Sequence, residues 1–204
     1  MGIQPIPNTQ YPISNKVALL TGAARPPGPA LALALAAQGW RVALNDLNPR
    51  ALDEIVHQIT ETGGTARAHI ADISSKVALQ TILNDLEDEW GQIDTLINNT
   101  RVIPNKPLLD MDEWDWRRTL DVNLTGAFLL TQVVGRMMRA RGGGVIVHLL
   151  QPDEAEGHAA YATTQAGVEV MVRVAEKELG IVGVRVKFIL LEAGVGTEEL
   201  LQAL

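Results

Sequence analysis

Short runs of apolar, often β-branched residues alternate along the chain with longer stretches in which apolar residues recur every three or four positions. A short apolar run between turn residues is typical of a buried strand, and the longer spacing is typical of a helix. The pattern predicts strands at Lys16–Leu20, Arg41–Leu44, Ala66–Ile70, Ile93–Ile97, Val145–Leu149 and Val184–Leu191. It predicts helices at Gly28–Gln38, Pro49–Thr62, Ser75–Trp90, Glu113–Ala140 and Tyr161–Leu179, with a further helix starting at Thr197.

This alternation of strands and helices predicts an α/β fold: a doubly wound parallel sheet with helices on both faces, in three layers and one domain. Residues 1–14 carry prolines and no periodicity, so we expect an N-terminal extension before a domain at 15–204. Ligands of such sheets bind at the carboxyl ends of the strands. The residues that directly follow each strand are therefore the candidates for function.

Composition excludes several classes of protein. The chain has 204 residues, 47% of them hydrophobic, and no cysteine, which excludes a disulfide scaffold and a thiolate metal site. The net charge of -7 argues against a nucleic-acid partner. The longest wholly apolar stretch, Ala30 to Ala37, is too short to cross a bilayer, and the N-terminus lacks the pattern of a signal peptide. We expect a cytoplasmic protein with no membrane partner.

The residues at the strand ends carry a resemblance to a known family. They are Thr21-Gly22-Ala23-Ala24-Arg25 with Gly28, then Asp46, Asp72-Ile73, Asn98-Asn99, Leu120-Asp121-Val122-Asn123 and Tyr161. In this order, from about residue 14 to 197, they resemble the short-chain dehydrogenase/reductase family, and most of all its 3-oxoacyl-carrier-protein reductases. A single glycine-rich loop is a weak signal, but six landmarks on the expected elements are a specific one.

The resemblance implies a Rossmann-like fold that binds a nicotinamide dinucleotide. The cofactor-binding residues that it implies are Gly22, Arg25, Gly28, Asp46, Asp72, Ile73 and Asn99. The catalytic residues that it implies are Tyr161, which transfers a proton, and Asn123, which holds a proton-relay water. It also implies a dimer or higher oligomer through helices 113–140 and 161–179. In the second of these helices the apolar residues cover a wider surface than a single buried face would need.

The cofactor loop departs from the family's pattern. Pro26 stands where the family has glycine, and Pro27 where it has a residue with a free N–H. Such a loop holds pyrophosphate with backbone N–H groups, and proline has none. Gly28 and Pro29 instead favour a loop that starts a stable helix. Arg101 replaces the glycine of the Asn-Asn-Ala-Gly motif, where its cation either attracts phosphate or fills the site.

Asp46 is the cofactor signal that survives best. It lies 24 positions after Gly22, close to the spacing expected for a carboxylate on the ribose 2′-hydroxyl. A carboxylate repels a 2′-phosphate, so NAD is expected over NADP if either binds. Arg25 favours NADP instead, because its guanidinium can pair with the 2′-phosphate. The alternative for Asp46 is an ordinary strand-end aspartate that caps the next helix.

The partners of Tyr161 are also changed. The family's catalytic serine aligns with the Leu150-Gln151 pair, and Gln165 stands in the place of its lysine, four residues after Tyr161. An amide carries no charge and cannot lower the pKa of a tyrosine by attraction. At an ordinary pKa of about 10, only roughly one tyrosine in a thousand is ionised at pH 7. Gln151 can still donate to a carbonyl, whereas Thr164 is expected to bond to its own helix.

Other residues give weaker signals. His148, Glu156 and His158 match no established metal-ligand spacing and are expected to be solvated loop residues, so no metal is expected. Trp114 and Trp116 are expected to be packing residues. Leu191-Glu192 replaces the family's usual Pro-Gly, and the residues that follow are too few for its substrate lid and last strand. We therefore expect a domain that lacks both.

Three hypotheses remain open from the sequence. The first is a degenerate member of the family with little or no hydride transfer, acting as a structural or regulatory subunit in a homodimer or beside an intact homologue. The second is an active NAD-dependent oxidoreductase on a carbonyl or alcohol, using Tyr161 and Asn123. The third is a dinucleotide sensor that binds without reacting. The losses gather at positions that touch phosphate, nicotinamide or substrate, which favours the first.

Overall fold

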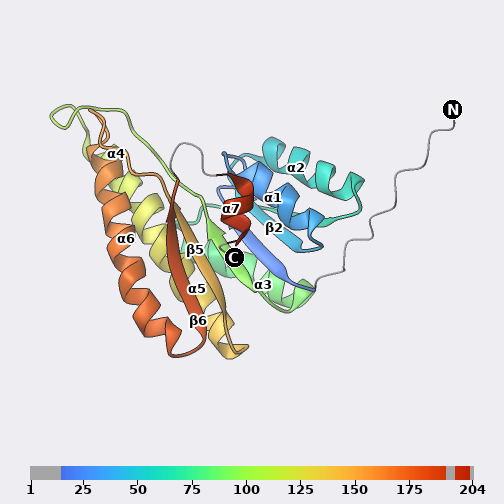
Figure 1. Cartoon of the computed structure of the whole chain (residues 1–204). Helices are drawn as coiled ribbons and strands as arrows, with labels where there is room; N and C mark the ends of the chain where they lie inside the picture. The colour runs from blue at the N-terminus through green and yellow to red at the C-terminus, as the bar shows by residue number, and fades with distance from the viewer. Residues whose placement is uncertain (1–14, 192–195, 203–204) are drawn as a thin grey trace, which may run out of the picture.

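A computed structural model describes residues 15–191 and 196–202 (Figure 1). The expected extension at residues 1–14 lies outside the described residues. The same holds for Glu192, the second residue of the pair that replaces Pro-Gly. The strands are β1 (Val17–Thr21), β2 (Arg41–Asp46), β3 (Thr65–Ile70), β4 (Thr95–Asn98), β5 (Gly144–Leu150) and β6 (Val184–Leu190). They form one sheet in the order β3-β2-β1-β4-β5-β6, and every neighbouring pair is parallel. The predicted α/β fold class is confirmed.

The helices cover both faces of this sheet, as Figure 1 shows. They are α1 (Gly28–Ala37), α2 (Pro49–Glu61), α3 (Lys76–Trp90), α4 (Glu113–Thr119), α5 (Gly126–Ala140), α6 (Ala159–Gly180) and α7 (Thr197–Gln202). On one face α1, α2 and α7 form a core around Leu31, Leu52 and Leu200. On the other face α3, α5 and α6 form a core around Leu79, Leu130 and Val168.

The central strand β1 is apolar from Val17 to Leu20 because both faces of the sheet are buried there. Leu19 belongs to the core of one face, and its neighbour Leu20 belongs to the core of the other. Successive side chains on a strand point to opposite faces, so each of these four residues needs an apolar side chain. This explains why the sequence shows continuous apolar runs rather than an alternation of apolar and polar residues.

The order of the strands reverses between β1 and β4. Thr21, the last residue of β1, is paired with Asn98, the last residue of β4. The Thr21 hydroxyl donates to Asn98 Oδ1 at 2.8 Å, which ties the two strand ends together. A crevice at such a reversal is where sheets of this kind bind their ligands. The fold therefore places the candidate site beside the ends of β1 and β4.

The long helix expected at Glu113–Ala140 spans those residues as α4, η1 and α5, and it differs from the expectation only in its middle turns. Between α4 and α5 lies a π-helical segment, η1 (Leu120–Thr125), in which the turns are wider. Burial continues through it, from Val122 in η1 to Ala127 in α5. Because the apolar spacing is not interrupted, the pattern of the sequence gave no sign of the change. The described helices include none long and apolar enough to cross a membrane.

Candidate functional site

The loop between β1 and α1 approaches the end of β4 closely, and two glycines make this possible. Gly22 has a φ of +64°, and a Cβ placed there would lie 2.6 Å from the backbone of Asn99. A Cβ on Gly28 would lie 2.6 Å from the carbonyl oxygen of Ala23. Both predicted glycine positions therefore shape the loop that was expected to hold a cofactor.

The backbone donors of this loop are already engaged within the chain. Ala23 N donates to Asn45 O at 3.1 Å, Arg25 N to Gly22 O at 3.3 Å, and Gly28 N to Arg25 O at 2.7 Å. Ala24 N donates to Asp46 Oδ2 at 3.1 Å. The other loop residues before the first turn of α1 are prolines, which have no N–H to offer. From residue 23 to residue 29, no backbone N–H is left for a pyrophosphate.

Asp46 braces the loop from the end of β2. One carboxylate oxygen accepts from Ala24 N, and the other accepts from Asn48 N at 3.1 Å. The cap of α2 is Asn48, whose side chain accepts from Ala51 N at 3.2 Å. The alternative in which Asp46 caps α2 is therefore wrong. Each carboxylate oxygen keeps a second lone pair that can still accept from a hydroxyl.

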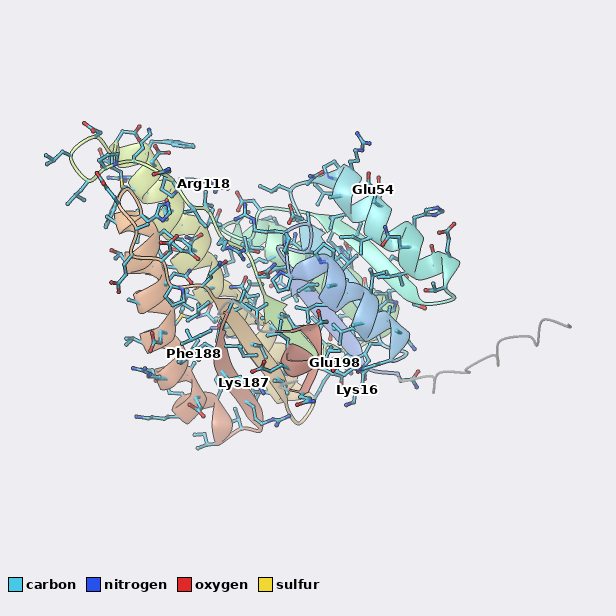
Figure 2. The ribbon with its side chains drawn as sticks, turned by 45° about the horizontal axis from the view of Figure 1, so that its top comes forward. Lys16, Glu54, Arg118, Lys187, Phe188 and Glu198 are labelled. Carbon is cyan, nitrogen blue, oxygen red and sulfur yellow. The ribbon has the colours of Figure 1, made fainter. Side chains whose placement is uncertain are left out.

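Asp72 and Ile73 follow β3 as expected, and Asp72 is paired. Its carboxylate accepts from both the backbone N–H and the hydroxyl of Ser74, and it pairs with Arg118 at 2.9 Å. Burial by itself would raise the pKa of Asp72, but the hydrogen bonds from Ser74 and Arg118 outweigh it and hold this pKa below its ordinary value. Figure 2 labels Arg118. Ile73 is buried, with 2% of its surface exposed.

Arg101 connects the end of β4 to the cofactor loop. Its guanidinium donates to Asn99 Oδ1 at 2.9 Å and to the carbonyl oxygen of Pro26 at 3.3 Å. Asn99 in turn donates to the carbonyl oxygens of Gly22 and Arg25, each at 2.9 Å. Arg25 donates back to the carbonyl oxygen of Arg101 at 3.0 Å. Of the two alternatives for Arg101, the geometry favours a side chain that fills the site.

A cavity of about 400 Å³ lies between these elements. The predicted residues among those that line it are Gly22, Arg25, Asp46, Asp72, Ile73 and Asn99, and Arg101 lines it too. Tyr161, Gln151 and Asn123 are not part of its lining. The structure thus brings the predicted cofactor residues together but separates them from the predicted catalytic ones. With its backbone donors engaged, this chain's loop does not fit the pyrophosphate of a dinucleotide.

Tyr161 is buried, and its hydroxyl is engaged within the chain. Its side chain is 0% exposed, and its hydroxyl donates to the backbone carbonyl oxygen of Gln151 at 2.7 Å. Burial raises the pKa of Tyr161, although Arg101 opposes the shift. Gln165 Oε1 accepts from the backbone N–H of Gln151 at 2.9 Å. The glutamine in the lysine's place therefore holds the strand end and leaves the phenol neutral.

The side-chain amide of Asn123 is also hydrogen-bonded within the protein, through both its oxygen and its nitrogen. In η1, its Oδ1 accepts from Val102 N at 2.7 Å, and its Nδ2 donates to Val102 O at 2.9 Å and to the Thr164 hydroxyl at 3.1 Å. The Thr164 hydroxyl donates to Tyr161 O at 2.7 Å, which confirms that it bonds to its own helix. Asn123 thus joins the segment after β4 to α6.

The residues considered as metal ligands do not come together. Nowhere in the ranges 15–191 and 196–202 do three or more His, Cys, Asp or Glu residues gather in a way that could hold a metal ion. His148 was expected in solvated surroundings, and this was wrong: it lies on β5 with 0% exposure. Its ring contacts Asn98 Nδ2 at 3.1 Å and the Thr131 hydroxyl at 2.9 Å. His158 pairs with Asp153 at 2.9 Å at the edge of its loop.

Sequence reasoning missed two residues of the cavity. Arg118 pairs with Asp72, and its partner lies 46 positions away in the sequence, so no local spacing links them. Trp114 was expected to pack, but it is 70% exposed and lines the cavity. Both lie on α4, which the uninterrupted apolar pattern merged with α5. The apolar spacing gives no sign of the change at η1, so no local signal could have placed them at the cavity.

Comparison with known proteins adds to this geometry. A family model described as short chain dehydrogenase matches residues 16–198. A 3-oxoacyl-[acyl-carrier-protein] reductase of Synechocystis sp. is 35% identical over 178 residues, which are 85% of this chain and 72% of the relative. The (2S)-[(R)-hydroxy(phenyl)methyl]succinyl-CoA dehydrogenase subunit of Thauera aromatica is 35% identical over 85% of this chain and 71% of its own. The structure of NAD+-bound xylitol dehydrogenase matches with a TM-score of 0.83 and 31% identity, over 93% of this chain and 75% of that one.

Proposed function

The chain belongs to the short-chain dehydrogenase/reductase family, and from that premise we propose that it is a member without hydride transfer that serves as a structural or regulatory subunit of an oligomer. One observation carries the proposal: the hydroxyl of Tyr161 is buried and donates to a backbone carbonyl. A proton donor must lie within hydrogen-bond reach of the substrate. The Tyr161 hydroxyl instead donates its hydrogen bond to the backbone carbonyl oxygen of Gln151.

The surroundings of Tyr161 support the same proposal. Gln165 supplies no charge that could stabilise a tyrosinate, and Asn123 is bonded to Val102 and Thr164. Positioned acid–base catalysis is worth about 10²–10⁴ in rate, so a site without it loses most of that factor. The loop before α1 offers no free N–H to a pyrophosphate, which argues against tight cofactor binding as well.

The subunit role is supported by the surface that α5 and α6 share. A second cavity of about 460 Å³ lies between them, lined in part by Phe128, Gly135, Met171, Val174 and Leu179. Phe128 is 46% exposed and Val174 is 50% exposed, although both are apolar. Exposed apolar patches of this kind mark interaction sites. The name of one relative describes it as a dehydrogenase subunit, which supports a subunit role.

A Val174→Asp variant is expected to lose the oligomer, because a carboxylate would be buried without a partner in the α5–α6 interface. Light scattering on the separated peak should give the mass of a dimer or larger assembly for the wild-type chain and of a monomer for the variant. Val77→Asp is the matched control, since Val77 is 78% exposed on α3, away from this surface. A wild-type mass retained by Val174→Asp contradicts the proposal.

Loss of hydride transfer is tested with NADH and a 3-oxoacyl thioester as the carbonyl probe. We expect oxidation of NADH no faster with the wild-type chain than with Tyr161→Phe, because the hydroxyl that is removed donates to the backbone of Gln151. The variant should instead lose about 1 kcal/mol of stability with its hydrogen bond to Gln151. Wild-type turnover that disappears in Tyr161→Phe overturns the proposal in favour of an active oxidoreductase.

A further inference from the structure

A polar groove of about 400 Å³ lies at the amino ends of β1, β4, β5 and β6, at the end of the sheet opposite to the candidate cofactor site. Its charged and hydroxyl-bearing lining residues are Lys16, Asp94, Thr95, Arg141 and Arg185, and we call it the amino-end groove. None of the residues that line it also lines the cofactor cavity. Its chemistry is therefore separate from that of the site described above.

Positive charge exceeds negative charge around the amino-end groove. Its three cationic residues are Lys16, Arg141 and Arg185. Among the residues that line it, Asp94 supplies the single carboxylate. Asp94 Oδ2 already accepts from Val17 N at 2.7 Å and from Gln92 Nε2 at 2.8 Å. Because the chain as a whole has a net charge of -7, this excess of positive charge is local to the groove.

Arg185 is the cation of the groove that lacks an acidic partner. Across residues 15–191 and 196–202, no carboxylate lies within ion-pairing distance of its guanidinium. Burial lowers the pKa of Lys187, also on β6, and the positive charge of Arg185 lowers it further. Lys187 and Lys16 both lie in the lower half of Figure 2. Cations that repel one another in this way gain free energy from an anion placed between them.

Thr95 provides an unpartnered hydroxyl in the floor of the groove. The residue is 1% exposed, and its hydroxyl makes no hydrogen bond within the described chain. The sheet pairs Thr95 with Val145 and Val145 with Arg185, so the three lie in one row across β4, β5 and β6. Val145 belongs to the core on the α1 side, so Thr95 and Arg185 face that side too. A buried polar group without a partner often marks a missing ligand or water.

We propose that the amino-end groove binds a diphosphate group, whose oxygens pair with Arg185, Arg141 and Lys16 and accept from the Thr95 hydroxyl. Neighbouring strands are about 4.8 Å apart, so Lys16 beside β1 and Arg185 on β6 stand on strands roughly 14 Å apart. Two linked phosphates span such a distance more fully than one, and each forms charge-assisted hydrogen bonds. Trp40 holds Lys16 at the groove, with Nζ 5.0 Å from the centre of its ring. The site goes beyond the proposed subunit role and does not depend on it.

The test is calorimetry on the full chain with inorganic pyrophosphate, inorganic phosphate and ADP as probes, at matched ionic strength. Pyrophosphate should bind at least about tenfold more tightly than phosphate. Arg185→Gln should weaken pyrophosphate roughly tenfold to a hundredfold, as expected for lost hydrogen bonds between charged groups. ADP distinguishes the source of the diphosphate: affinity equal to that of pyrophosphate points to a nucleotide, and weaker affinity points to free pyrophosphate. Either ADP result supports the proposal when the affinity falls in Arg185→Gln.

Two further variants make the result specific to the groove. Thr95→Val removes the hydroxyl at nearly constant volume and should weaken pyrophosphate roughly threefold to tenfold. Its melting temperature should stay unchanged or rise, because the hydroxyl that is lost has no partner, whereas a merely structural hydroxyl would lower it. Arg50→Gln is the matched control, since Arg50 on α2 pairs with Glu54, which Figure 2 shows well apart from Lys16, and it should leave binding unchanged.

Three results would overturn the proposal. They are equal affinities for phosphate and pyrophosphate, no binding of pyrophosphate at millimolar concentration, and a pyrophosphate affinity that is unchanged in Arg185→Gln. Arg185 is exposed, so its replacement is expected to fold. Turnover of NADH would bear only on the proposed function, because the groove lies at the other end of the sheet.

Discussion

A Gly22→Ala variant is expected to lose roughly 2–5 kcal/mol of its free energy of unfolding, the sum of backbone strain and overpacking. Gly22 has a φ of +64°, a conformation that alanine adopts at a cost. The new methyl group would also lie 2.6 Å from the backbone of Asn99. Asn99 cannot easily retreat, because its amide holds the carbonyl oxygens of Gly22 and Arg25. The melting temperature should fall by on the order of 10 °C.

Gly63→Ala separates the two causes. Gly63 has a φ of +82°, but a Cβ there meets nothing within 4 Å. This control therefore carries the backbone strain alone and should lose about 1–2 kcal/mol in chemical denaturation. Equal losses in the two variants would contradict the close approach of the loop to β4, and with it the closed shape of the cofactor site.

The stability of the chain should fall as the pH is lowered from 6.5 towards 4, with a contribution of roughly 3 kcal/mol from His148. Burial lowers the pKa of His148 to about 4 in the folded state, against 6.5 when unfolded. Between pH 6.5 and about 4, His148 is therefore protonated in the unfolded chain but stays neutral in the folded chain. The stabilisation is complete above pH 6.5 and is lost as the pH falls through this window.

Urea unfolding at pH 7.5 and pH 4.5 measures this effect, and nuclear magnetic resonance of the imidazole gives the titration directly. His57→Gln is the control, because its ring is exposed and pairs only with Glu61. It should keep the pH dependence, whereas His148→Gln should reduce it. A resonance of His148 that titrates near pH 6.5 would contradict the buried, neutral imidazole between Asn98 and Thr131.

Much of the fold could be predicted from local patterns because the sheet is buried on both faces. The inner strands of such a sheet, such as β1, are apolar runs, and turn residues mark their ends. The π-helical segment between α4 and α5 could not be predicted, because buried residues continue through η1. The cap of α2 was also ambiguous from the sequence: Asp46 and Asn48 are both suitable side chains, and only the geometry shows that Asn48 caps.

The candidate site was predictable in its parts but not in its connections. The prolines of the loop predict missing backbone N–H donors, because proline has no N–H group. That the N–H groups of Ala23 and Ala24 are also engaged depends on Asn45 and Asp46, far along the chain, whereas those of Arg25 and Gly28 are engaged within the loop itself. The role of Arg101 was open for the same reason, because its acceptor on Pro26 lies 75 positions away in the sequence. Long-range hydrogen bonds therefore decide what the motifs leave undecided.

The most direct test of the closed cofactor site is a titration of the wild-type chain with NADH and NADPH up to millimolar concentration, followed by cofactor fluorescence and by melting temperature. A ligand that binds only the folded state raises its stability by an amount set by its concentration over its Kd. We expect no saturable fluorescence change and no rise in melting temperature at micromolar cofactor, because no backbone donor between residues 23 and 29 is free. Saturable micromolar binding of either dinucleotide would contradict the account.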